Sequence, residues 1–210
     1  QDALRKADQL KPQTQGMSID AIMQALGMPG VAAEGRFFPD TYTYAKGSSD
    51  LAVLRRAAHA MDKKLAAAWA QRGPQSPLQT AEQALILASI VEKETGKGSD
   101  RAMVSSVFNN RLRIGMRLQT DPTVIYGLGD SFDGNLRKKD LLTDTPWNTY
   151  TRVGLPPTPI AMPGKASLQA AVQPAPSKAL YFVARGDGSS EFSATLDEHN
   201  RAVNKYQRGQ

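Results

Sequence analysis

An apolar run that ends in two carboxylates, LILASIVEKET, occupies residues 85–95. Thr80 can cap a helix that begins just before this run, because the sequence TAEQ matches the capping-box pattern. Gly96 and Gly98 follow the carboxylates and are typical helix terminators. The pattern therefore predicts a helix over residues 81–95.

Helical rotation of about 100° per residue decides which side of this helix each carboxylate occupies. Leu87, Ile90 and Val91 fall on one side, with Glu94 near the middle of their apolar stripe and Glu92 toward its edge. A buried carboxylic acid loses hydration when it ionises, so its pKa rises and it can hold a proton near neutral pH, as a general acid must. Glu94 is therefore the candidate acid. Periodicity also allows a helix that frays after Val91, with both glutamates solvated.

Composition limits the chemistry that the chain can perform. Its 210 residues, 40% hydrophobic and 22% charged, suffice for one substantial core, and we expect a single domain over residues 1–210. The absence of cysteine excludes disulfides, thiolate metal sites and a cysteine nucleophile. His59 and His199 are the only histidines, so we expect no multi-histidine metal site and no cofactor.

The net charge of +6 suits a polyanionic partner. The alternatives are nucleic acid, an anionic membrane surface and a wall polymer that bears carboxylates. Arg111, Arg113 and Arg117 form one local basic cluster, and residues 137–139 form another. Neither cluster alternates with aromatic residues or lies in a helix-turn-helix pattern, so we predict no nucleic-acid binding.

The remaining segments predict an α+β fold that is mostly helical, with a small antiparallel β-sheet and a substrate groove. The segment 128–144 is charged and turn-rich and predicts a mobile loop, whereas 154–164 contains four prolines and predicts a rigid extended segment. The elements expected elsewhere are two short helices before Gly27, a helix from Asp50 to Gln71, a helix that Ser99 caps and Gly115 ends, a helix over 166–172, paired strands over 179–184 and 189–195, and a closing helix.

Aromatic residues are dense in EGRFFPDTYTY, residues 34–44, where Pro39 blocks a regular helix. Aromatic faces stack on sugar rings, so these residues form either a wall of a sugar-binding groove or a loop that anchors the core. The same two interpretations, a sugar contact or core packing, apply to Trp147.

Several motifs together carry a resemblance to a known family. LASIVEKET is followed by SVFNNRLRIGMRLQTDPTVIYG from Ser106, WNTYTRVGLPPTPIAMPGKASLQAA from Trp147 and LYFVARGDG from Leu180, and EGRFFPDTYTY precedes them. In this order and at this spacing, the motifs resemble the endolytic murein transglycosylase family (MltG, YceG-like) over nearly the whole chain.

The resemblance implies an enzyme that cuts the β-1,4 bond between N-acetylmuramic acid and N-acetylglucosamine within nascent peptidoglycan and leaves a 1,6-anhydromuramic end. One glutamate carries this chemistry in the family, and Glu94, the second glutamate of the ExE pair, matches it. Protonated Glu94 would donate to the glycosidic oxygen and then, as a base, take the proton of the muramic C6 hydroxyl that attacks C1. An intramolecular nucleophile makes a second catalytic carboxylate dispensable.

Polar residues of the same motifs supply the neutral donors and acceptors that sugar hydroxyl and acetamido groups require. Asp121 is the candidate second carboxylate, but Asp before Pro also makes turn bonds to its own backbone, so it either shapes the groove or acts as a nucleophile. The resemblance implies that the groove residues are Gln119, Asp121, Thr123, Tyr126, Asn148, Thr149 and Tyr150.

The resemblance also implies a location and partners. Family members carry an N-terminal membrane anchor and a LysM-like lobe, which these residues do not contain. The chain is therefore expected to be a catalytic domain on the periplasmic side of the bacterial inner membrane, acting on glycan strands beside peptidoglycan synthases. The competing interpretations are a muramidase, in which water attacks, and a peptidoglycan-binding module without turnover.

Overall fold

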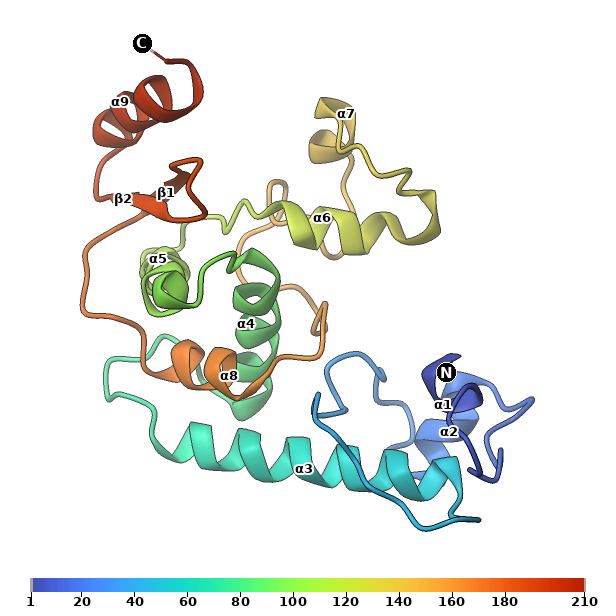
Figure 1. The fold of residues 1–210 in the computed structure, drawn as a ribbon. Coiled ribbons are helices and arrows are strands. Elements are labelled where there is room, and N and C mark those ends of the chain that lie inside the picture. Colours follow the sequence, from blue (N-terminus) through green and yellow to red (C-terminus); the bar gives the residue numbers. More distant parts are fainter. Residues whose placement is uncertain (1, 210) are drawn as a thin grey trace.

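The protein is described here by a computed structural model that covers residues 2–209. Helices predominate, and the one sheet is a pair of antiparallel strands, so the expected α+β class is confirmed (Figure 1). The elements are α1 (Asp2–Arg5), α2 (Ile19–Ala25), α3 (Asp50–Ala70), α4 (Ala81–Glu94), α5 (Arg101–Arg113), α6 (Asp121–Leu128), α7 (Lys138–Leu142), α8 (Lys165–Val172), β1 (Tyr181–Ala184), β2 (Ser190–Ser193) and α9 (Leu196–Gln207), with 3-10 turns at Gly98–Asp100 and Gly129–Ser131.

Helix α4 lies at the centre of the core. Thr80 caps it by accepting a hydrogen bond from the Gln83 amide, as the sequence predicts. Every residue from 84 to 91 is buried, because α4 packs against α3, α5, α6 and α8. The predicted apolar stripe of Leu87, Ile90 and Val91 is buried, and because protein surrounds α4 along this stretch, apolar residues lie on its other sides as well.

Helices α3 and α8 form the layer beneath α4 (Figure 1). Ser49 caps α3 by accepting from the Ala52 amide, and Met61 and Leu65 of α3 belong to the buried core. The N-terminal segment is tied to the start of α3 through Asp50, whose buried carboxylate accepts from the Thr14 hydroxyl at 2.6 Å and from its amide.

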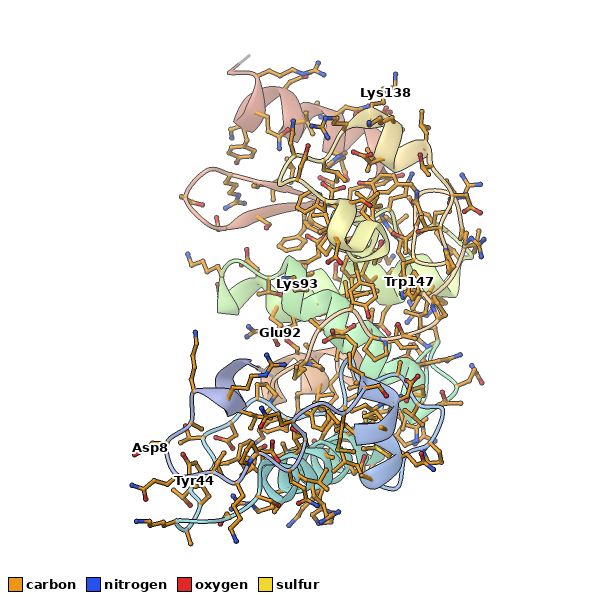
Figure 2. All side chains as sticks on the ribbon, turned by 90° about the vertical axis from the view of Figure 1, so that its right-hand side faces the viewer. Asp8, Tyr44, Glu92, Lys93, Lys138 and Trp147 are labelled. Carbon is orange, nitrogen blue, oxygen red and sulfur yellow. The ribbon has the colours of Figure 1, made fainter. Side chains whose placement is uncertain are left out.

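The aromatic segment 34–44 anchors the core and the N-terminal segment. Phe38 is buried in the core, and Tyr42 donates to the Phe38 carbonyl at 2.8 Å. Tyr44 donates to the carbonyl of Asp8 at 2.9 Å, and both residues lie at the lower left of Figure 2, apart from Trp147 and Glu92. Of the two interpretations of this segment, anchoring is the one that these contacts favour.

Strands β1 and β2 form a hairpin that lies between α5 and α9 (Figure 1). Phe182 of β1 meets Phe108 of α5 edge-to-face, with ring centroids 6.0 Å apart. On the α9 side, the Tyr181 ring stacks on His199 at 5.2 Å. The hairpin therefore brings the C-terminal helix to the core.

Two local predictions were wrong, the cap of α5 and the loop over 128–144. Ser99 does not cap α5, since its hydroxyl donates to Asp100 and the helix begins at Arg101 after a 3-10 turn. Residues 121–128 form α6, in which Pro122 lies in the first turn, where a missing N–H costs no helical hydrogen bond. The segment expected to be a loop throughout, 128–144, contains α7. None of the helices in residues 2–209 is both long and apolar enough to span a membrane.

Candidate active site

Glu94 is the last residue of α4, and its carboxyl group is partly buried. The Thr120 hydroxyl donates to Glu94 Oε1. Burial is the main cause of a raised Glu94 pKa; the Thr120 hydrogen bond opposes it, the charge of Asp121 adds to it, and the charge of Arg111 opposes it. The negative end of the α4 dipole also disfavours an anion at this position. The group is thus biased toward its protonated form.

An unusual backbone conformation places Thr120. Gln119, just before it, has φ of 49°, in the left-handed region that costs energy for a non-glycine residue. Two hydrogen bonds to Thr149 hold this strained stretch, from the Gln119 amide to the carbonyl at 3.1 Å and from the Thr120 amide to the hydroxyl at 3.0 Å. Thr120 is also the N-cap of α6, yet its side chain caps nothing and contacts Glu94 instead.

Three of the predicted groove residues lie behind this contact. Thr123 is 0% exposed; its hydroxyl donates to the Thr120 carbonyl at 2.7 Å and lies 2.8 Å from the Thr149 hydroxyl. Asn148 is 1% exposed, and its amide donates to the carbonyls of Leu141 and Thr143 at 3.1 and 2.7 Å. In this structure Thr123 and Thr149 support Thr120, and Asn148 supports the loop at residues 140–143.

Asp121, Gln119 and Tyr150 all line the same pocket as Glu94. The Tyr150 hydroxyl donates to Asp121 Oδ1 at 2.5 Å. Burial, followed by this hydrogen bond, raises the Tyr150 pKa, so the phenol keeps its proton and remains a donor. The Asp-Pro sequence had suggested a turn bond from Asp121 to its own backbone. In the structure, a side chain from another loop, that of Tyr150, holds the Asp121 carboxylate instead.

Arg111 is a pocket residue that the sequence analysis did not single out as a candidate for the site. In the sequence it belongs to a local basic cluster with Arg113 and Arg117, and in the structure it is 7% exposed and lines the pocket beside Glu94. Its Nε donates to the Leu180 carbonyl at 2.7 Å and its Nη1 to the Leu118 carbonyl at 2.6 Å. A signal was present: Arg111 follows Val104, Val107 and Phe108 by seven, four and three residues, which places it on the apolar side of α5.

The pocket has a volume of about 650 Å³, within the range of ligand-binding clefts. His199 lies at its wall, and its Nδ1 is buried without a hydrogen-bond partner in residues 2–209. Burial, and then the charge of Arg111, lower the His199 pKa. The pocket is lined by Glu94, Arg111, Gln119, Asp121, Tyr150, the four residues of β1, and Leu196, His199, Val203 and Gln207 of α9.

Tyr126 and Trp147, by contrast, do not line this pocket. Their rings meet edge-to-face at 5.5 Å and pack against the core, and the Trp147 indole donates to the Thr158 hydroxyl at 2.9 Å. Core packing is therefore the interpretation that the Trp147 contacts favour. Within the described part of the chain, no three His, Asp or Glu side chains lie close enough together to hold a metal ion.

Comparison with known proteins identifies the class to which this fold and site belong. Residues 2–205 match the YceG-like family, and the chain belongs to that family. A crystal structure of a YceG-like protein from Listeria monocytogenes superposes with a TM-score of 0.71 and 36% identity over 86% of this chain and 62% of that one.

Two curated relatives carry the name endolytic murein transglycosylase. The protein from Bacillus subtilis strain 168 is 38% identical over 82% of this chain, and the one from Streptococcus pneumoniae strain D39 is 31% identical over 81%. These matches cover 48% of the Bacillus protein and 31% of the Streptococcus protein, so the chain spans about half and a third of their lengths.

Proposed function

We propose that this chain is a peptidoglycan lytic transglycosylase that cuts the bond between N-acetylmuramic acid and N-acetylglucosamine within glycan strands. The observation that carries the proposal is the partly buried Glu94, held by Thr120 at the wall of an open pocket. The names of the relatives and the family resemblance supply the substrate class. Glu94 serves first as the acid and then as the base.

In the first step, Glu94 protonates the glycosidic oxygen as the bond to C1 of the muramic sugar breaks. Thr120 donates to Oε1, and Oε2 has no partner in residues 2–209. A carboxylic acid carries its proton on one oxygen and can accept at the other. Thr120 thus marks Oε1 as the acceptor and leaves Oε2 to carry the proton into the pocket.

In the second step, the Glu94 carboxylate removes the proton of the C6 hydroxyl, and the C6 oxygen attacks C1 of the same sugar to give the 1,6-anhydro end. Arg111 and the Thr120 hydroxyl both favour the ionised form that exists between the two steps. An intramolecular nucleophile has a high effective concentration, so no second carboxylate has to activate water. Asp121, engaged by Tyr150, shapes the pocket.

Mass spectrometry of the products tests this proposal. The chain and its Glu94→Gln and Glu92→Gln variants are incubated with uncrosslinked glycan strands. We expect anhydromuramic ends from the unaltered chain and from Glu92→Gln, and none from Glu94→Gln. Ends heavier by one water would instead show a muramidase, and strands left intact by all three proteins would favour a binding module.

We also propose that the full protein works on the periplasmic side of the bacterial inner membrane, beside peptidoglycan synthases. The support is the resemblance to anchored family members, together with relatives that extend well beyond the matched region. Membrane fractionation of cells that express the complete gene tests the location, and recovery in the soluble fraction alone would overturn it.

A further inference from the structure

Among residues 2–209, no strand lies beside one edge of β1. β1 pairs with β2 in the register Val183↔Glu191, and the Arg185 amide donates to the Ser189 carbonyl at 2.9 Å. Along an antiparallel strand, the N–H and C=O groups of successive residues point alternately toward the partner strand and away from it. Since Val183 and Arg185 face β2, the backbone groups of Phe182 and Ala184 point away from it. Neither residue has a further backbone partner in residues 2–209.

The free edge faces the pocket that holds Glu94. Leu180 lies just before β1; its amide donates to the Ser193 carbonyl of β2 at 2.9 Å, while its own carbonyl accepts from Arg111 Nε. Arg111 lines the pocket, as do all four residues of β1. The guanidinium group of Arg111 and the unpaired backbone groups of Phe182 and Ala184 therefore lie on the same wall of the pocket.

Unpaired N–H and C=O groups on a strand edge are a template for an extended peptide. Arg111 adds a charge to this template: two of its nitrogens donate to carbonyls, and its third, Nη2, has no partner among the described residues. No carboxylate forms an ion pair with it in that part of the chain. A peptide that carries a carboxylate matches both features, the backbone edge and the free guanidinium N–H.

We propose that the free edge of β1 binds the peptide substituent of the glycan strand, as a short third strand beside Glu94, with Arg111 holding a carboxylate of that peptide. The inference rests on the proposed function, because the glycan in the pocket is what delivers the peptide. Two outward-facing residues pair with only about three residues of a partner strand, so the contribution to binding is modest. Loss of one such hydrogen bond weakens binding about tenfold.

The first experiment compares two substrates: uncrosslinked glycan strands with their peptides, and the same strands after an amidase has removed the peptides. We expect the unaltered chain to cut the peptide-bearing strands with a kcat/KM at least about tenfold higher. Equal rates would overturn the peptide site and leave the proposed function intact. Failure to cut either substrate would instead count against the proposed function.

Ala184→Pro removes one outward N–H without touching the ladder to β2. It should reduce the preference for peptide-bearing strands about tenfold. Arg201→Ala, on α9 beside the β2 flank of the hairpin, is the matched control and should keep the preference. A preference that Ala184→Pro leaves intact in a folded protein would overturn the proposal.

A second measurement covers the case in which Ala184→Pro does not fold. Glu94→Gln is mixed with each type of strand, and hydrogen exchange is followed at the amides of Phe182 and Ala184. Peptide-bearing strands should slow exchange at both amides, and peptide-free strands should not. Equal protection by the two types of strand would overturn the proposal.

Discussion

The Thr120 hydroxyl donates to Glu94 Oε1, and this contact joins the end of the central helix to the start of α6. A threonine at a helix N-cap normally bonds its own helix, and substitution of such a cap costs about 0.5–2 kcal/mol. Here that local stabilisation is absent, and the hydroxyl instead holds the candidate acid. Departures from local preference of this kind are expected at functional sites.

Thr120→Val should slow glycan cleavage and shift its pH dependence. The hydroxyl lowers the Glu94 pKa, so its removal raises that pKa, and the alkaline fall in activity moves to higher pH. A hydrogen bond to an ionised group is worth about 1.5–3 kcal/mol, so the maximal rate should fall about tenfold or more. The measurement is the rate of anhydromuramic release between acid and alkaline pH.

Thr95→Val is the control for that change. Thr95 follows Glu94 directly, and its hydroxyl donates to the Val91 carbonyl at 2.6 Å without touching the acid. It should leave the alkaline limb where it is. An equal shift in both variants would mean that the end of α4 is disturbed in general, and that Thr120 has no specific role.

Asp121→Asn should move the same limb in the opposite direction. The Asp121 charge raises the Glu94 pKa, so the neutral amide lowers it and activity is lost at lower pH. The rate at the optimum should fall by less than in Glu94→Gln, because a groove-shaping residue does not transfer protons. Abolished cleavage in Asp121→Asn would instead indicate a second catalytic carboxylate, as in most glycoside hydrolases. Tyr150→Phe, which removes only the Asp121 donor, is the matched control.

Glu92 should prove structural, although it belongs to the same ExE pair. Its Oε2 accepts from the Gly164 amide at 3.0 Å and from the Ser167 hydroxyl at 2.6 Å, at the N-terminus of α8, and Figure 2 shows it between α4 and α8. A carboxylate that bonds a helix N-terminus contributes about 1–2 kcal/mol. Glu92→Ala should lose about that much in urea unfolding, whereas Lys93→Ala, an exposed neighbour, should not. Unchanged stability in Glu92→Ala would contradict this role.

Local signals were enough to predict helices α3 and α4. The capping-box pattern of the sequence at Thr80 placed the start of α4 correctly, and the pattern after Asp50 placed the long helix α3. The same periodicity put Glu94 on a buried side, which agrees with its environment. These features depend on residues within one or two turns of one another, and a sequence displays such relationships directly.

The partners of Glu94 could not be predicted in the same way. Thr120 lies 26 residues beyond it, and its position depends on the left-handed backbone of Gln119, a conformation that no local rule requires of a glutamine. In the sequence, Arg111 belongs to a basic cluster with Arg113 and Arg117; in the structure those two are exposed, whereas Arg111 is buried. Its burial depends on carbonyls of Leu118 and Leu180, which only the folded chain brings together.

Glu94→Gln should make the protein more stable at neutral pH while it abolishes cleavage. The Glu94 pKa is raised in the folded state, mainly by burial, so the folded chain binds the proton more tightly than the unfolded chain does. The contribution of Glu94 to the free energy of unfolding is therefore fully present below the pKa of Glu94 in the unfolded chain. It is lost as the pH rises through the pKa of Glu94 in the folded chain. Glutamine carries no charge and avoids this loss. The gain in melting temperature should grow as the pH rises above about 4, the ordinary pKa of a glutamate side chain, and should vanish below it. In a chain of this size, each kcal/mol of added stability corresponds to a rise of about 2–4 °C in melting temperature.

A gain that is constant with pH would contradict the raised pKa of Glu94. The control is Glu92→Gln, which alters a side chain that bonds the start of α8, and it should show no such gain.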